Sequence, residues 1–422
     1  MRRMNPWWKT IGPGLVTGAS DDDPAGIATY TQAGAMFGLG TLWMALFTLP
    51  LTLAIQEACA RIALVSRQGL FALFRKTLPR SVTLVLLSSF LAANIFNLAA
   101  DLNMMAASMQ LLVPSPRWLW LVGFTALSLG LQVFLRYASY ARVLRWLVTA
   151  LLAYVAVLFF VDLPWREALR QTVWPAILNG KEFLLIVIAI LGTTLSPYLY
   201  VWQASEELEE SAECRREHVG RAVVCSVNNP RVLSAMRLDV SVGMVVSNLV
   251  FWCIVAASAA TLHAHGITDV ATADQAAAVL RPLVGPIATV LFTLGIVGTG
   301  LLTLPVLAGS AAYALAEVKD WRRSLNDDWR VSPKFYGAIA ASMVLGLLLT
   351  TWEIPPIKML LWSAIANALL APPLLAGILW IGNRRDVMKG NVSGRWSNAG
   401  VGLSLVVMTV SAAVWAWLVL VT

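Results

Sequence analysis

The stretch Ser20-Asp21-Asp22-Asp23-Pro24-Ala25-Gly26 interrupts an apolar segment that runs from Ile11 to Ala33. A carboxylate at the centre of a membrane-spanning helix costs roughly 2.5 to 3.5 kcal/mol on insertion scales, so three in succession require compensation. Pro24 has no amide hydrogen and disfavours the α region for Asp23, while Gly26 tolerates dihedral angles that other residues avoid. The stretch therefore predicts an unwound turn, where a buried carboxylate beside freed backbone carbonyls favours a bound cation.

The composition is typical of a membrane protein. The 422 residues are 58% hydrophobic and only 13% charged, a balance that a water-soluble domain of this size does not carry without large exposed apolar patches. The apolar runs are long and continuous, as in spanning helices, and not short and alternating, as in the strands of a barrel. We expect an all-α membrane protein, with residues 1–422 forming a single transmembrane domain in the lipid bilayer.

Eleven segments are apolar over the roughly 20 residues that a spanning helix needs. They run from Ile11 to Ala33, Leu39 to Val65, Val82 to Leu112, Trp118 to Leu135, Val143 to Val161, Phe183 to Gln203, Val240 to Leu262, Leu283 to Ala314, Phe335 to Thr350, Ile357 to Ile381 and Ala399 to Val421. The longest polar insert, from Ser205 to Leu238, is interpreted as a solvated loop.

The basic residues predict the orientation. Most of the 31 lysines and arginines lie in the segments on the same side as the N-terminus, which places the N-terminus in the cytoplasm and, with an odd number of spans, the C-terminus outside. We expect a multi-pass protein of the inner (plasma) membrane. Because the net charge of +8 follows the topology, we expect no nucleic-acid partner, and nothing in the sequence implies an obligate protein partner.

A second interruption lies in the sixth span, at Leu191-Gly192-Thr193-Thr194-Leu195-Ser196-Pro197-Tyr198. For Pro197 taken alone, a simple kink explains the sequence equally well. Paired breaks at corresponding places in two halves, however, indicate an inverted-repeat transporter with its site near the middle of the membrane. We expect residues 11–163 (helices 1–5) and 182–382 (helices 6–10) to form a 5+5 inverted repeat, with helix 11 (residues 399–421) outside it.

Further polar residues lie inside the spans. Asn94, Asn97 and Asp101 share one face of the third span because their spacing is i, i+3, i+7. Hydrogen bonding between helices is the ordinary role of such asparagines, whereas a buried Asp101 favours a functional role. Asn248 in the seventh span and Asn367 in the tenth leave both interpretations open.

The remaining reactive side chains predict no second site. The four cysteines lack the spacing of a zinc site or a disulfide framework and are interpreted as small apolar fillers. The three histidines lie in loops, where they cannot ligate a metal within the membrane. These residues are Cys59, Cys214, Cys225, Cys253, His218, His263 and His265. No span holds a nucleophile–base cluster, so we expect neither an enzyme nor a cofactor.

The motifs resemble those of the natural resistance-associated macrophage protein (NRAMP) family of divalent metal transporters. The resemblance covers essentially the whole chain and rests on Gly12-Pro13-Gly14, Asp23-Pro24-Ala25-Gly26, the stretch from Gln56 to Arg61, Ser196-Pro197-Tyr198 and Asn248. It implies the leucine-transporter fold, with helices 1 and 6 discontinuous. It also implies that Asp23, the backbone carbonyl of Thr193 and Ser196 face the metal ion, with Gly26 beside it.

Two departures from the family pattern bear on the substrate. Gly26 replaces the asparagine of the Asp-Pro-Gly-Asn motif, and Ser196-Pro197-Tyr198 replaces Met-Pro-His. A thioether favours softer ions such as manganese and iron, so its loss leaves an all-oxygen site similar to that of the NRAMP-related magnesium transporters. Mg²⁺ keeps several waters when bound, and a small Gly26 leaves room for them. The residues expected around the ion or along its path are Asp22, Asn97, Asp101, Tyr198, Asn248 and Asn367.

The resemblance therefore implies import of a divalent cation by alternating access, with Mg²⁺ favoured and Mn²⁺ second. The histidine position of the family is Tyr198, which does not titrate near neutrality, and the ninth span has no arginine in its interior. We therefore expect transport without proton coupling, driven by the membrane potential, which supplies roughly 2.3 kcal/mol per charge per 100 mV. A proton-coupled Mn²⁺/Fe²⁺ symporter is the alternative, and a metal sensor that does not transport is the alternative of another class.

Overall fold

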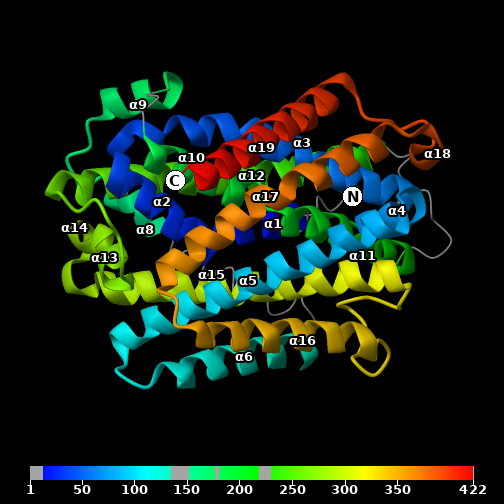
Figure 1. Cartoon of the computed structure of the whole chain (residues 1–422), viewed down its shortest axis with the longest axis horizontal. Helices are drawn as coiled ribbons and strands as arrows, with labels where there is room; N and C mark the ends of the chain where they lie inside the picture. The colour runs from blue at the N-terminus through cyan, green and yellow to red at the C-terminus, as the bar shows by residue number, and fades with distance from the viewer. Residues whose placement is uncertain (1–12, 135–151, 176–179, 218–229, 422) are drawn as a thin grey trace, which may run out of the picture.

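The protein is described by a computed structural model over residues 13–134, 152–175, 180–217 and 230–421. Within these ranges every regular element is a helix (Figure 1). The long unbroken helices are α3 (Trp43–Ser66), α5 (Arg80–Leu112), α6 (Arg117–Phe134), α12 (Pro230–Thr261), α15 (Ala288–Lys319), α16 (Pro333–Leu349), α17 (Pro356–Asn383) and α19 (Arg395–Val421).

The first and sixth spans are each divided into two helices. The first consists of α1 (Pro13–Asp21) and α2 (Pro24–Phe37), and the sixth of α10 (Lys181–Thr194) and α11 (Pro197–Glu217). Shorter helices lie between the spans: α4 (Leu70–Thr77), α8 (Leu152–Val157), α9 (Trp165–Val173), α13 (Ala273–Ala277), α14 (Arg281–Val284) and α18 (Arg385–Met388). Both breaks occur where the sequence predicts them, because each second half begins at a proline that cannot continue the preceding ladder of hydrogen bonds.

Nine helices in the described ranges are long and apolar enough to cross a membrane, with α10 and α11 taken together. The first span adds α1 and α2, which are individually shorter. The fifth expected span, Val143 to Val161, lies partly outside the described residues, and its visible end is α8. The all-α membrane fold with two discontinuous helices is thereby confirmed.

One expectation about the loops was wrong. The polar insert from Ser205 to Leu238 is helical at both ends, because α11 continues to Glu217 and α12 begins at Pro230. The physical reason is that Glu209 finds partners outside its own helix. Glu209 accepts hydrogen bonds from the hydroxyl of Tyr313 and from the backbone amide of Leu325, 2.8 Å away. These contacts hold this part of α11 against α15 and the segment that follows it, which stabilises the helix beyond the end of the span.

The packing brings both broken helices to the centre of the bundle. α12 contacts α1, α2 and α3, and α3 in turn contacts α11, while α10 packs on α17. The pair α6 and α16 lies at one edge of the bundle in Figure 1, and α19 lies against α3 and α17.

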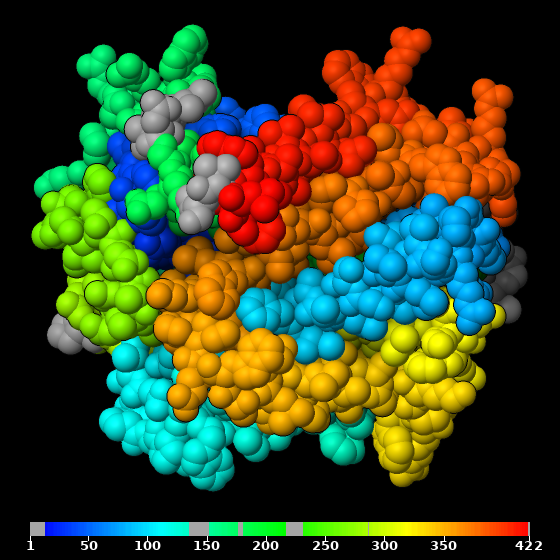
Figure 2. Space-filling view, viewed as in Figure 1, coloured from blue at the N-terminus to red at the C-terminus, as the bar shows by residue number. Residues whose placement is uncertain are grey.

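Apolar side chains cover the outside of the bundle as well as its core. Figure 2 shows α5, α16, α17 and α19 forming much of one outer face, and these helices expose Val85, Leu348, Trp362 and Val406. The interior is filled by large aromatic side chains, among them Tyr30, Tyr198 and Trp202, each with at most 1% of its surface exposed. A helical bundle that is apolar on its outer surface as well as in its interior is suited to a lipid environment.

Candidate cation site

The first break is set by Asp23, which caps the N-terminus of α2. Its backbone is extended (φ −70°, ψ 170°), as expected before a proline, and its Oδ1 accepts the amide hydrogen of Gly26 over 2.6 Å. The carboxylate therefore lies at the positive end of α2, which stabilises its charge. The predicted unwound turn is confirmed.

The second break leaves backbone carbonyls at the end of α10, and side-chain hydroxyls satisfy them. Leu195 has φ −106° and ψ 49°, so the helix stops before Pro197. The hydroxyl of Ser196 lies 2.9 Å from the carbonyl oxygen of Gly192 and 2.7 Å from that of Thr193. The hydroxyl of Tyr200 donates to the carbonyl of Leu195 over 2.6 Å. The break thus gathers several neutral oxygen atoms in a small volume.

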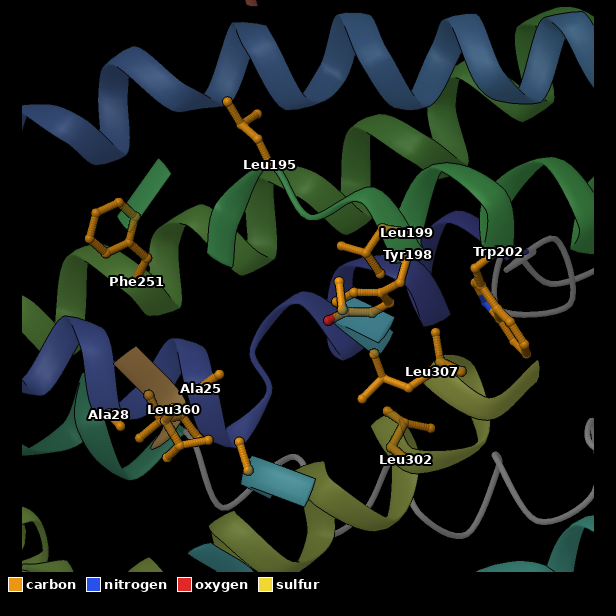
Figure 3. Close-up of a cluster of buried hydrophobic side chains, with 14 of the residues drawn as sticks. Ala25, Ala28, Leu195, Tyr198, Leu199, Trp202, Phe251, Leu302, Leu307 and Leu360 are labelled. Carbon is orange, nitrogen blue, oxygen red and sulfur yellow. The ribbon is translucent and has the colours of Figure 1, made fainter. Parts of the chain in front are cut away.

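Tyr198 joins the two breaks. From the first turn of α11, its hydroxyl lies 2.9 Å from the carbonyl oxygen of Ser20 and 3.1 Å from Oδ2 of Asp23. Figure 3 shows Tyr198 and Leu199 in the buried interior, with Leu302 and Leu307 of α15 nearby. One side chain therefore links the unwound turn of the first span to the start of α11.

Asp21 and Asp22 point to a different helix. The hydroxyl of Ser247 on α12 lies 2.7 Å from Oδ2 of Asp21 and 3.2 Å from Oδ1 of Asp22. Because a serine has one hydroxyl hydrogen, it can satisfy only one of these carboxylates fully at a time. Oδ1 of Asp21 has no hydrogen-bond partner in the described part of the chain. Nothing in the sequence distinguished Ser247 from other small residues of its span.

The polar stripe of α5 supplies a third wall. Asp101 is fully buried, and it lies close enough to Asp23 for the two carboxylates to repel one another. Among the described residues, no side-chain hydrogen bond forms to either of its carboxylate oxygens or to the amide of Asn97. Asn94 instead donates to the carbonyl of Leu307 on α15 over 3.4 Å. The stripe therefore combines one packing residue with two residues whose polar atoms are available to an ion or its waters.

Of the two remaining asparagines, one is used in helix packing and the other has an unsatisfied amide oxygen. Asn248 accepts from Thr48 of α3 over 2.9 Å and donates to the carbonyl of Met244 over 3.1 Å, so its amide serves helix packing. Asn367 is buried, and its amide oxygen has no partner within the described ranges.

Gly26 borders the carboxylate directly. A Cβ atom added there would lie 3.1 Å from the carbonyl oxygen of Asp21, 3.3 Å from Oδ1 of Asp23 and 3.3 Å from the ring of Tyr30. All three distances are shorter than ordinary van der Waals contact with a Cβ, so in this conformation Gly26 lies packed against the two oxygens and the ring with less than the room of a methyl group beside it.

The histidines and cysteines lie away from these breaks or outside the description. His263 lies 2.8 Å from the carbonyl oxygen of Ala35 and His265 lies 2.5 Å from that of Thr261, while His218 and Cys225 lie outside the described residues. Cys59 and Cys253 are buried and free, as expected, but Cys214 is disulfide-bonded, which corrects the expectation for that residue.

The described conformation closes the site at the end where α1 begins. The amide of Gly14 donates to Asp239 of α12 over 2.5 Å, and Thr17 donates to Gln203 of α11 over 2.5 Å. Asp23 is only 2% exposed. No group of three or more His, Cys, Asp or Glu residues in the described ranges is arranged to hold a metal ion.

The chain is similar to transporters over nearly its whole length. A bacterial relative named divalent metal cation transporter MntH, from Verminephrobacter eiseniae, is 28% identical over 390 residues, covering 89% of this chain and 82% of the relative. The protein of the same name from Acidiphilium cryptum is 27% identical over 409 residues, covering 94% of this chain and 88% of its own. The relatives are thus transporters and not enzymes.

Solved structures show the same fold. The manganese transporter of Eremococcus coleocola superposes with a TM-score of 0.76 at 14% identity, covering 98% of this chain and 87% of that one. Mhp1, a nucleobase-cation-symport-1 family transporter, reaches 0.55 at 16% identity over 97% and 92% of the two chains. The leucine-transporter type of fold is therefore confirmed. Because residues 14–418 match the model of the natural resistance-associated macrophage protein-like proteins, this chain belongs to the NRAMP family.

Proposed function

We propose that the protein carries a divalent metal cation across the membrane by alternating access, and that the ion is held between the breaks of the first and sixth spans. The observation that carries the proposal is the contact between Tyr198 and Asp23, because it brings a buried carboxylate to the oxygen-rich end of α10. The family relatives are named as divalent metal cation transporters, which supports the same substrate class.

The proposed ligands are the carboxylate of Asp23, the backbone carbonyl of Thr193 and the hydroxyl of Ser196, with Gly26 beside them. All four residues are buried. Asp101 and Asn97 face the same region with unsatisfied polar atoms and would contact the ion through water. Tyr198 contacts Asp23 directly, and Asn367 belongs to α17, whose Ala364 and Ala368 lie against Gly192. Asp22 is proposed to lie along the ion path, whereas the contacts of Asn248 give it a packing role.

We further propose that Mg²⁺ is the favoured ion and Mn²⁺ the second. Every proposed ligand atom is an oxygen, and Mg²⁺ is commonly bound by one or two carboxylates while keeping several waters. No sulfur atom is among the proposed ligands, and sulfur is what selects softer ions.

Transport is proposed to run without proton coupling. Tyr198 stands where the family pattern has histidine, and α16 contains no arginine. An inside-negative potential supplies roughly 2.3 kcal/mol per charge per 100 mV, or about twice that for a divalent cation. This direction of transport assumes the topology inferred from the basic residues, with the N-terminus in the cytoplasm and the C-terminus outside.

The second candidate function is proton-coupled manganese uptake. It is favoured by the match to the Eremococcus coleocola manganese transporter and by the buried Asp101, a group able to carry a proton. A metal sensor without flux is distinguished from both by a transport measurement.

The decisive experiment measures flux into proteoliposomes under an imposed inside-negative potential. We expect Mg²⁺ uptake that Mn²⁺ inhibits and Ca²⁺ inhibits less, with no acidification of the lumen. Asp23→Asn is expected to abolish flux, and Asp274→Asn, which removes an exposed acid whose ion pair in the described part of the chain is with Arg281, is expected to retain it. Manganese uptake without magnesium uptake contradicts the selectivity, metal-dependent acidification contradicts the uncoupled mechanism, and the absence of any flux contradicts the carrier.

A further inference from the structure

A groove of about 550 Å³ lies between α3, α12 and the start of α19. It opens at the end of the bundle that carries the basic loops, which the charge bias assigns to the cytoplasm. Its lining holds three arginines, Arg61, Arg237 and Arg395, and a single acidic residue, Glu57. None of the residues that line the groove is among the proposed cation ligands.

The inner wall of the groove is a fixed network around Arg61, which is only 4% exposed. Its Nε lies 3.1 Å from Glu57, and its Nη2 donates to the hydroxyl of Ser393 over 2.9 Å and to that of Ser397 over 3.2 Å. Glu57 also accepts from Nε of Arg237 over 3.1 Å. One carboxylate is therefore shared by two guanidinium groups, which leaves the wall with excess positive charge.

The outer part of the groove adds positive charge that is only partly neutralised. Arg237 is 58% exposed, and within the described part of the chain its hydrogen bonds use only Nε, so both terminal nitrogens are free. Arg395 is exposed in the first turn of α19 and forms no ion pair among the described residues. The positive charge of Arg395 is repelled by the positive N-terminal end of the α19 dipole. A bound anion at this place would stabilise both charges.

The rim of the groove is suited to a lipid. Trp396 is 91% exposed, and Leu53 and Leu233 line the wall below it. Tryptophan is enriched at the membrane–water interface, where its ring lies at the level of the headgroups. An acyl chain can pack along the two leucines. This contact adds binding free energy for a lipid but not for a free inorganic anion.

We propose that this groove binds the phosphate of an anionic phospholipid, with Arg237 and Arg395 contacting the headgroup and Arg61 fixing the wall behind them. Basic pockets between spanning helices on the cytoplasmic side are suited to anionic headgroups, and each arginine near the surface contributes about a fivefold gain in affinity. The bound lipid links α19 to α3 and α12, and thereby to the helices that pack around the cation site.

The test measures lipid binding to the purified full-length protein, by the thermal shift in detergent and by native mass spectrometry. We expect phosphatidylglycerol to stabilise the protein, and phosphatidylcholine and inorganic phosphate to have no comparable effect at equal concentration. Arg395→Gln, which breaks no ion pair or side-chain hydrogen bond among the described residues, is expected to weaken phosphatidylglycerol binding about fivefold. Trp396→Ala is expected to weaken it as well.

The matched control is Arg385→Gln, which removes an exposed arginine of α18 that lies outside the groove lining. We expect this variant to bind phosphatidylglycerol within twofold of the unchanged protein. Equal losses in Arg385→Gln and Arg395→Gln mean a diffuse surface charge and overturn the proposal. Equal stabilisation by phosphatidylcholine, or displacement of the lipid by inorganic phosphate, overturns it as well.

Discussion

The hydroxyl of Tyr198 lies 3.1 Å from Oδ2 of Asp23, and this hydrogen bond spans the two broken helices. The same hydroxyl reaches the carbonyl of Ser20 over 2.9 Å, so its single hydrogen is shared between two acceptors. The phenol therefore holds the carboxylate loosely, and a cation that binds Asp23 competes with a weak donor and not with a fixed ion pair.

Tyr198→Phe tests this competition. The ring still fills its buried volume, so we expect a loss of about 1 kcal/mol in unfolding free energy from the missing hydrogen bond. Transport is expected to persist, with higher apparent metal affinity because the carboxylate loses a competing donor. Thermal denaturation and flux titrations measure the two effects. Complete loss of flux contradicts this account and makes the phenol essential.

Ser196→Met is expected to change ion preference. The substitution places a thioether where a hydroxyl lies 2.7 Å from the carbonyl of Thr193, and sulfur favours softer ions. We expect the ratio of Mn²⁺ to Mg²⁺ uptake to rise about tenfold, which corresponds to ~1.4 kcal/mol. The matched control is Ser196→Ala, which removes the hydroxyl without adding sulfur. An equal shift in both variants indicates that the thioether is not the cause.

Ser247→Ala is expected to destabilise the start of the first break. Its hydroxyl is the side-chain donor that Asp21 and Asp22 share, and burying acceptors without a donor costs about 1–3 kcal/mol. Ser258→Ala on the same helix is the control, because the Ser258 hydroxyl is buried without a partner in the described chain. Thermal denaturation compares the stability of the two variants. Similar losses of stability in both would mean that the Ser247 hydroxyl does not stabilise Asp21 and Asp22.

Gly18→Leu is expected to displace α1 from α12. A Cβ atom at Gly18 would collide with the backbone of Gly243, so the close packing of the two helices cannot form. We expect amide hydrogen exchange in α1 to accelerate about tenfold or more, since a loss of ~1.4 kcal/mol in local stability has that effect. Gly123→Leu on α6 is the control, because no atom lies within 4 Å of its added Cβ. Unchanged exchange in Gly18→Leu shows that α1 is not held by this contact.

The sequence by itself determined where the chain crosses the membrane and where two of those crossings break. Pro24 and Pro197 act through local backbone chemistry, and Asp23 is conspicuous because a carboxylate is costly in an apolar segment. These signals require no knowledge of neighbouring helices, so the spans and the unwound turns followed from residues alone.

Only the tertiary structure decided which polar residues meet. Tyr198 and Asp23 are 175 residues apart, Ser247 and Asp21 are 226 apart, and their contacts depend on the rotation of each helix about its axis. The same packing pairs Asn248 with Thr48 and leaves Asn97 unsatisfied, although both asparagines look alike in the sequence. Periodicity identifies a polar face, but the neighbouring helix determines whether that face is used for packing or left open to an ion.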